Sequence, residues 1–212
     1  MNTAAPQARA GLAAALAACL GLAALSLAVA HGLTAGFDRA LLADFAALRG
    51  PGRDGFFLTV TWLGSGYVLA PAALLIAAAL AARRERRATA LFVLTYFGAS
   101  LTTWLLKMAM GRERPALHAP LVEIAAWDWS FPSSHATQSA AFALGLWLLV
   151  ARLRPGWRWP AGLALAAVVL LVAASRLHLQ VHWPSDLIGG LLVAVAWAGL
   201  AALFTTPGVK RT

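Results

Sequence analysis

Long apolar runs separated by short polar segments dominate the chain. Runs of about 20 residues are long enough to cross the hydrocarbon core of a bilayer. Because lipid offers the backbone no hydrogen-bond partners, each spanning run is predicted to be a helix. The pattern therefore predicts an all-α integral membrane protein, a six-helix bundle with short loops. The expected spans are about 11–30, 56–82, 88–110, 136–150, 160–174 and 184–204.

The composition supports a single membrane domain over residues 1–212. Hydrophobic residues make up 61% of the chain and charged residues 12%, whereas soluble domains carry about 25% charged residues. The formal net charge is +9, but the basic residues mostly flank the apolar runs. The membrane surface therefore explains this charge better than a nucleic-acid partner does. The single cysteine, Cys19, excludes an intrachain disulfide.

Two N-terminal features need separate interpretation. The run 11–30 follows Arg9 and ends in Ala28-Val29-Ala30, which is similar to a signal peptide with its small-residue cleavage site. The run is long for such a peptide, so we expect an uncleaved first helix. The polar segment after it contains a stretch, 38–48, that we expect to form a short helix at the membrane interface.

Basic residues at the ends of the spans predict the orientation of the bundle. One side is almost purely basic, whereas the other side carries both signs about equally. The basic side is therefore predicted to be cytoplasmic, with both termini inside and the polar loops of interest on the outer side of the inner membrane. The basic side holds Arg9, Arg83, Arg84, Arg86, Arg87, Arg152, Arg154, Arg158, Lys210 and Arg211.

The stretch from Ser175 to Asp186 contains the first candidate site residues. Arg176, His182 and Asp186 lie between two apolar runs, where an ionisable group costs about 3 kcal/mol on insertion scales and usually has a function. His182 and Asp186 have i,i+4 spacing, which places them on one helix face. A carboxylate beside an imidazole fixes its tautomer and strengthens it as a nucleophile or base.

Two further segments share this chemistry. Lys107 and Arg114 are cations around the end of the third run, although Lys107 alone fits a snorkelling anchor. Arg112 is more ambiguous, because it stands beside Glu113 and is a candidate to pair with it. Ser133 and Ser134 precede the fourth run, where they suit either helix capping or phosphate binding by free backbone N–H groups. Capping does not explain His135 at the mouth of that anion site.

A metal site is the alternative for the histidines. His178, His182 and Asp186 are spaced i, i+4, i+8, as if they shared one helix face for zinc. Pro184 argues against one continuous helix and more readily begins the sixth span. We therefore expect no metal and no cofactor, and His178 is expected near the site or at the interface.

These motifs resemble a known family. Lys107-x6-Arg114-Pro115, Pro132-Ser133-Ser134-His135 and Ser175-Arg176-x5-His182-x3-Asp186 look like the three-part signature of the type 2 phosphatidic acid phosphatase (PAP2) family, which is related to vanadium haloperoxidases. The resemblance covers about half of the chain. Ser134 departs from the glycine that many members carry. The resemblance implies a metal-free, outer-face site with His182 as nucleophile, Asp186 orienting it and His135 as general acid. Lys107, Arg114, Arg176 and the backbone at Ser133 and Ser134 would hold the phosphate.

The functional expectation is a membrane phosphatase that hydrolyses a lipid phosphate or diphosphate through a phosphohistidine. Undecaprenyl diphosphate is the first expected substrate, by analogy with the family. Phosphatidylglycerol phosphate, phosphatidic acid and a lipid A phosphate are alternatives. A phosphotransferase that uses the same intermediate, and a non-catalytic lipid-binding or transport protein, are the rival functions. The expected partners are the lipid substrate and the membrane, not nucleic acid, and the sequence leaves the oligomeric state open.

Overall fold

The structure, a computed structural model, describes residues 4–123 and 128–205. All regular secondary structure in these residues is helical, and they contain no strand. Lys210 and Arg211, which entered the orientation argument, lie outside the described residues. The helices are α1 (Ala4–Ala30), α2 (Ala35–Ala47), α3 (Pro51–Val60), α4 (Gly66–Ala82), α5 (Arg86–Val93), α6 (Ala99–Met110), α7 (Ser134–Leu153), α8 (Arg158–His178) and α9 (Pro184–Thr205).

Short irregular turns join some helices into longer rods. η1 (Thr61–Gly64) is a 3-10 turn between α3 and α4, and η2 (Leu94–Gly98) is a π-helical turn between α5 and α6. A third turn, η3 (Pro155–Trp157), precedes α8. Six rods in the described residues are long and apolar enough to cross a membrane, which confirms the predicted all-α membrane fold. They are Ala8–Ala30, Pro51–Ala82, Arg86–Met110, Ser134–Leu153, Pro155–His178 and Pro184–Leu203.

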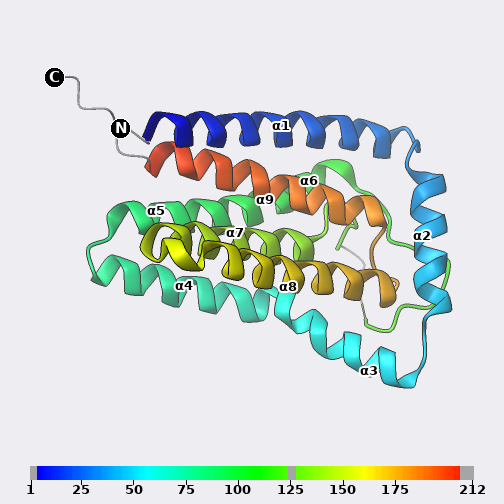
Figure 1. The fold of residues 1–212 in the computed structure, drawn as a ribbon. Helices are drawn as coiled ribbons and strands as arrows, with labels where there is room; N and C mark the ends of the chain where they lie inside the picture. The colour runs from blue at the N-terminus through cyan, green and yellow to red at the C-terminus, as the bar shows by residue number, and fades with distance from the viewer. Residues whose placement is uncertain (1–3, 124–127, 206–212) are drawn as a thin grey trace.

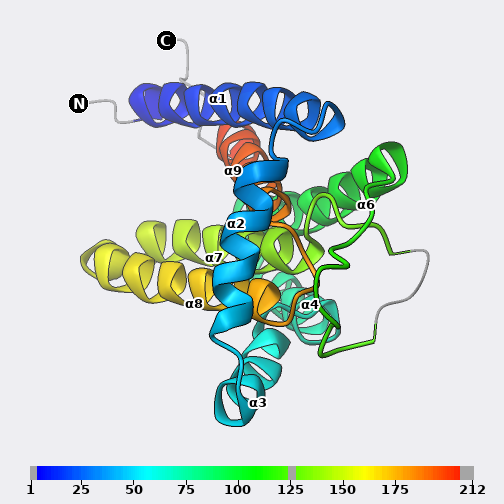
Figure 2. The same cartoon turned by 90° about the vertical axis from the view of Figure 1, so that its right-hand side faces the viewer.

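The rods form a bundle with one helix across its end. In Figure 1, α1 lies beside α9 along one edge, and α7 lies among α5, α8 and α9. Helix α2 runs nearly at right angles to the rods, and in Figure 2 it passes in front of the ends of α7, α8 and α9. It contacts α8 and α9. The stretch 38–48, which we expected to form a short interfacial helix, thus lies almost wholly within a helix that covers one end of the bundle.

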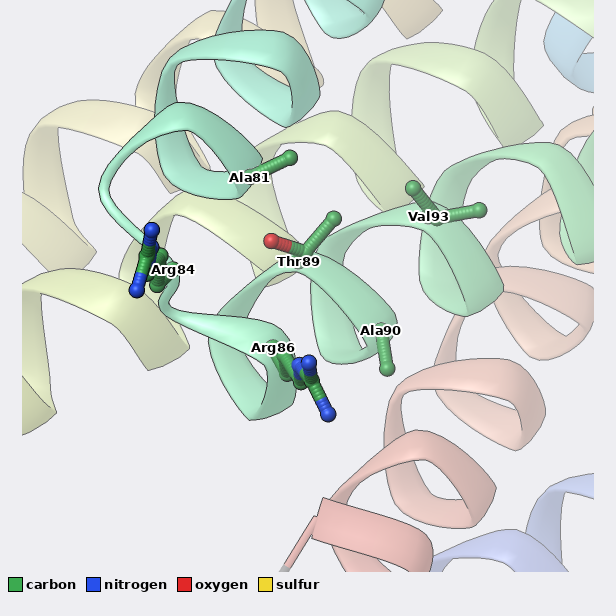
Figure 3. Close-up of a pocket in the computed structure, with 6 residues that line it drawn as sticks. All are labelled: Ala81, Arg84, Arg86, Thr89, Ala90 and Val93. Carbon is green, nitrogen blue, oxygen red and sulfur yellow. The ribbon is translucent and has the colours of Figure 1, made fainter.

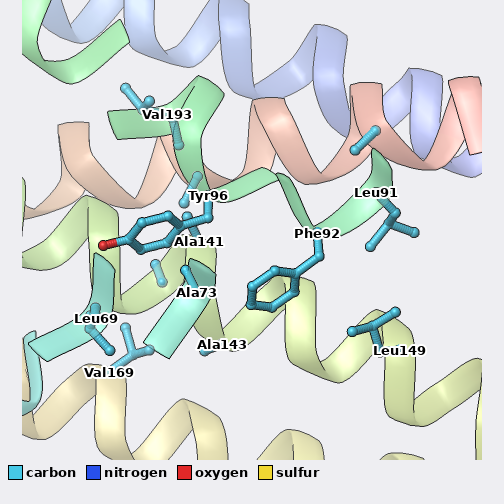
Figure 4. Close-up of a cluster of buried hydrophobic side chains, with 14 of the residues drawn as sticks. Leu69, Ala73, Leu91, Phe92, Tyr96, Ala141, Ala143, Leu149, Val169 and Val193 are labelled. Atoms are coloured by element: carbon cyan, nitrogen blue, oxygen red, sulfur yellow. The ribbon is translucent and has the colours of Figure 1, made fainter. Parts of the chain in front are cut away.

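The core is built where α7 packs against its neighbours. Phe92 and Tyr96 are fully buried beside alanines of α7, and Val193 of α9 closes the same cluster (Figure 4). Small residues allow helices in lipid to approach closely, so van der Waals packing can hold them together. Gly98 shows how close the approach is, because a Cβ there would lie 2.5 Å from the Trp197 ring.

Local sequence signals determine where the helices near α2 begin and end. The hydroxyl of Ser133 caps α7 by accepting a hydrogen bond from the N–H of Ala136 at 3.4 Å. Gly111 ends α6 with φ of +54°, a left-handed conformation that glycine adopts without strain. Because α6 stops there, the chain turns back towards α7 and brings Arg112 and Arg114 to the end of the bundle.

Candidate active site

The three motif segments meet at the end of the bundle that α2 crosses. Lys107 lies in the last turn of α6, His135 in the first turn of α7 and Arg176 in the last turn of α8. His182 follows in the loop to α9, and Asp186 lies in the first turn of α9. Helix ends remote in the sequence thus supply cations, imidazoles and a carboxylate to one region.

His182 and Asp186 form a buried pair. The Nδ1 atom of His182 lies 3.2 Å from Oδ2 of Asp186, and both side chains are almost inaccessible to solvent. Oδ2 also accepts hydrogen bonds from the hydroxyl of Ser130 at 2.5 Å and from the backbone N–H of Trp183 at 2.8 Å. Oδ1 accepts from Arg112 at 2.6 Å. With both oxygens engaged, the carboxylate has one fixed orientation against the imidazole.

The other ring nitrogen of His182 faces a cation. Its Nε2 lies 3.1 Å from Nη1 of Arg114, which also donates to the carbonyl of Val181 at 2.5 Å. Because an arginine N–H can only donate, Nε2 acts as the acceptor and the proton lies on Nδ1, towards Asp186. The structure therefore favours the tautomer whose lone pair points towards the cations.

Lys107 and Arg114 converge on one carboxylate, Asp128. Lys107 Nζ lies 2.9 Å from Oδ1 and Arg114 Nη2 lies 2.7 Å from Oδ2. Lys107 also donates to the carbonyl of Trp129, and Arg114 Nε donates to the carbonyl of Asp128 at 2.8 Å. Lys107 is 4% exposed, whereas the Asp128 side chain is 38% exposed. A buried lysine and a largely buried arginine thus hold an accessible anion between them.

Arg176 supplies a third cation from α8. It is 6% exposed and donates from Nη1 to the hydroxyl of Thr61 at 2.8 Å. Its Nε has no hydrogen-bond partner among the described residues. A buried guanidinium with an unused N–H is an available donor for an anion.

His135 stands at the start of α7 beside η1. A Cβ placed on Gly64 would lie 3.4 Å from Cδ2 of His135 and 2.4 Å from Val172, so only glycine lets η1 approach this closely. Ser133 is buried, and its N–H donates to the carbonyl of Asp186 at 3.0 Å. Ser134 is partly buried. The N–H of Ser133 is therefore bonded to α9 and is not a free donor.

The surroundings of His182 favour its neutral form. Burial is the main reason that the pKa of His182 is well below its usual range. The charges of Arg114, Lys107 and Arg176 lower that pKa further, and His135 adds a smaller contribution in the same direction. Burial likewise lowers the pKa of Arg114, whereas Asp128 and Asp186 raise it. Arg114, Lys107, Arg176 and His135 therefore all lie close enough to act on the His182 ring.

Sequence reasoning missed several residues that hold this geometry. Asp128, Ser130 and Asp38 all contact site residues, but they stand in loops or in α2 without a motif to mark them. Arg112 does not pair with the neighbouring Glu113. It bridges Asp38 and Asp186 instead.

The residues considered for zinc do not share a helix face. His178 closes α8, His182 lies in the following loop, and Pro184 begins α9. His178 is buried, with Nε2 2.7 Å from Oδ1 of Asp54 and its ring packed against Phe57. His178 therefore binds α8 to α3.

One surface hollow lies elsewhere on the bundle. It is an open hollow of about 780 Å³ at the turn between α4 and α5, near the end of the bundle opposite α2 (Figures 1 and 3). It is lined by Arg84, Arg86 and Thr89 together with Ala81, Ala90 and Val93. This lining has cations but no histidine or carboxylate that could act as a general acid or base, so the candidate active site is the α2 end.

A known family model matches this part of the chain. The family model described as the PAP2 superfamily matches residues 88–208, which contain all three motifs. The match covers more than half of the chain, so the chain belongs to the PAP2 superfamily, as its motifs predicted.

Individual relatives share the sequence or the fold. The chain is 30% identical over 143 residues to an undecaprenyl-diphosphatase of Sulfolobus acidocaldarius, a match that covers 66% of this chain and 65% of that protein. A PAP2-type phosphatidylglycerolphosphate phosphatase of Bacillus subtilis has a similar structure, with a TM-score of 0.77 at 24% identity over 93% of this chain and 98% of that one. LpxE of Aquifex aeolicus gives a TM-score of 0.62 at 24% identity, over 79% and 95% of the two chains.

Proposed function

We propose that this protein is a metal-independent membrane phosphatase that hydrolyses a lipid phosphate or diphosphate through a phosphohistidine at His182. One observation carries the proposal. His182 is buried with Nδ1 held by Asp186 and Nε2 directed at Arg114, within a group of three cations. A neutral imidazole with its lone pair directed at an anion-binding group is a poised nucleophile for phosphorus.

The cations have the role of stabilising charge. Phosphoryl transfer spreads negative charge over three equatorial oxygens, and preorganised donors lower its barrier. We assign Lys107, Arg114 and Arg176 to these oxygens, with the backbone N–H of Ser134 at the start of α7 as a further donor. The N–H of Ser133, the other expected donor, is bonded to the carbonyl of Asp186 in this structure. Asp128 occupies Lys107 and Arg114 in this structure, so the phosphate must displace that carboxylate or share its cations.

The reaction has two balanced steps. Nε2 of His182 forms a P–N bond while the P–O bond to the leaving lipid breaks, and His135 protonates the leaving oxygen. Asp186 stabilises the positive charge that develops on the His182 ring. His135 then takes a proton from water, whose oxygen attacks phosphorus and breaks the P–N bond. The products are inorganic phosphate and the lipid alcohol, or the lipid monophosphate when the substrate is a diphosphate.

Undecaprenyl diphosphate remains the first substrate to test. The name of the Sulfolobus acidocaldarius relative supports this choice, and the names of the structural relatives keep phosphatidylglycerol phosphate and lipid A phosphates on the panel. We further propose that the site faces the outer side of the cytoplasmic membrane and that both termini are inside. The arginines at the α4–α5 turn, at the end opposite the site, support this orientation.

The test is phosphate release by purified protein in detergent, with excess chelator, from a panel of lipid phosphates and diphosphates. We expect wild-type protein to release free phosphate and His182→Ala to lose this activity. His118→Ala is the matched control, because His118 is an exposed loop histidine. Phosphate that appears on an acceptor lipid instead of in solution would indicate a phosphotransferase. Activity retained by His182→Ala would refute the mechanism.

A further inference from the structure

A buried chain of charges connects α2 to the candidate active site. Asp38 of α2 is 1% exposed, and its Oδ2 lies 2.7 Å from Nη2 of Arg112. Nη1 of Arg112 lies 2.6 Å from Oδ1 of Asp186. One guanidinium therefore bridges two buried carboxylates, and the second of them holds His182.

Ser185 forms hydrogen bonds with both Asp38 and Arg112. Its N–H donates to Oδ1 of Asp38 at 2.9 Å and its hydroxyl donates to Oδ2 at 2.7 Å. The same hydroxyl accepts a hydrogen bond from Nη1 of Arg112 at 2.7 Å. Asp38 thus fixes both Arg112 and the first turn of α9, which carries Asp186. The Trp183 ring lies 5.6 Å from the guanidinium and covers it.

The sum of the charges on Asp38, Arg112 and Asp186 indicates how Asp38 would affect catalysis. Arg112 paired with Asp186 alone would be a neutral unit, with little charge left to act on the His182 ring. With Asp38 included, two carboxylates share one guanidinium, and the unit carries a net charge of −1 facing Nδ1–H of His182. In a buried environment such a charge acts strongly on a neighbouring imidazole. It stabilises the positive ring that forms when Nε2 bonds to phosphorus.

We propose that Asp38 is a positioning residue for catalysis. It acts through Arg112 to hold Asp186 against His182, and its negative charge offsets that of Arg112 so that the charge of Asp186 can act on the His182 ring. This inference rests on the proposed phosphatase function. Asp38 lies outside residues 88–208, the segment that the family model matches. Helix α2 is therefore a working part of the site, in addition to covering the end of the bundle.

The experiment compares Asp38→Asn with Asp44→Asn in the full-length protein in detergent. Asp44 lies on the same helix but is exposed, which makes it a matched control. Asparagine keeps the shape of Asp38 and removes its charge. We expect Asp38→Asn to lower kcat by about 10- to 100-fold, the usual effect of removing a supporting partner, with KM within about twofold. Asp44→Asn should match wild type in both constants.

A double-variant comparison separates positioning from general stability. If Asp38 acts through Asp186, Asp38→Asn should lower kcat by less than about twofold when Asp186→Asn is already present. A purely structural role would instead leave the two effects multiplicative. Activities are expressed per folded protein, measured as the monodisperse fraction on gel filtration.

Arg112→Lys provides a second variant, because a single ammonium cannot span both carboxylates as the guanidinium fork does. We expect the kcat of Arg112→Lys to fall by about as much as that of Asp38→Asn. Multiplicative effects, wild-type kcat in Asp38→Asn, or failure of both variants to give monodisperse protein would each overturn the inference. An inactive wild-type protein would remove the proposed function and this inference with it. Active wild-type protein with an unaffected Asp38→Asn variant would remove only the inference.

Discussion

The carboxylate of Asp186 and the ring of His182 form a pair with a defined tautomer: Oδ2 lies 3.2 Å from Nδ1, while Nε2 faces Arg114. Asp186→Asn should break this arrangement with little change in shape. The amide N–H₂ can donate to Nδ1, which moves the ring proton to Nε2 and removes the nucleophilic lone pair. In serine proteases the equivalent change costs about 10⁴-fold in kcat.

We therefore expect Asp186→Asn to lower kcat by about 10³-fold or more, with the thermal stability of the protein largely retained. Steady-state phosphate release measures the rate, and gel filtration after heating measures the stability. A variant that keeps more than a tenth of the wild-type kcat would show that the tautomer does not control the reaction.

Asp128 occupies the two cations that we assign to the substrate phosphate. Asp128→Asn should free Lys107 and Arg114, and should also remove a negative charge that repels the phosphate. We expect inorganic phosphate to inhibit this variant at about a tenfold lower concentration, which corresponds to about 1.4 kcal/mol. The measurement is the inhibition constant of phosphate.

Glu123→Gln is the control for Asp128, because Glu123 lies in the same loop and is exposed. Its inhibition constant should equal that of wild type. Weaker inhibition of Asp128→Asn would mean that Asp128 holds the cations in place for the substrate instead of competing with it.

The lowered pKa of His182 predicts a specific pH dependence of stability. Burial and the neighbouring cations keep the folded-state pKa well below 6.5, whereas the unfolded chain binds a proton near pH 6.5. The unfolded state therefore binds more protons as the pH falls below 6.5, and the folded state loses stability there. Above that pH both states are neutral, so the contribution of His182 is fully present.

We expect the free energy of unfolding of wild type to fall by up to about 1.4 kcal/mol per pH unit below pH 6.5 because of this residue. His182→Gln should lack that part of the dependence. Thermal unfolding of both proteins between pH 4.5 and 8 gives the comparison. Parallel pH curves for the two proteins would contradict the buried, neutral state of His182.

Gly64 should be intolerant of any side chain. A Cβ there would lie 2.4 Å from Val172 and 3.3 Å from the carbonyl of His135. We expect Gly64→Ala to lower the free energy of unfolding by about 1–3 kcal/mol, the usual cost of overpacking, and to lower activity by displacing His135. Gly36→Ala is the control, since nothing lies within 4 Å of its added methyl. Equal melting temperatures for the two variants would disprove the close approach.

Much of the fold could be predicted because hydrophobic length is a direct signal in membrane helices. The apolar runs predicted six spans, and the structure has six apolar rods within the residues that it describes. The polar ends were harder to place. The apolar run that predicted the fifth span ends near Ala174, but α8 continues to His178 because Thr61 and Asp54 bind the polar side chains of its last turn.

The site was predictable only where a motif marked it. Arg176, His182 and Asp186 could be recognised by their cost in an apolar setting and by their spacing. Asp38 and Asp128 could not, because a single acid in a polar segment has many possible partners and only the fold selects Arg112 or Lys107. Arg112 was likewise placed with its sequence neighbour, whereas its actual partners are more than 70 positions away.

The most direct test of the account is detection of phosphorus bound to His182. His135→Ala protein should be mixed with a lipid diphosphate labelled on its terminal phosphorus and quenched at alkaline pH. The leaving group is then a lipid monophosphate, which depends less on the proton that His135 supplies in the first step. Peptide mass spectrometry should find a base-stable, acid-labile phosphate on His182, because the variant lacks the base that activates water to cleave the P–N bond. His182→Ala should carry no label. Labelling of another residue, or turnover with no labelled peptide in any variant, would contradict the central claim.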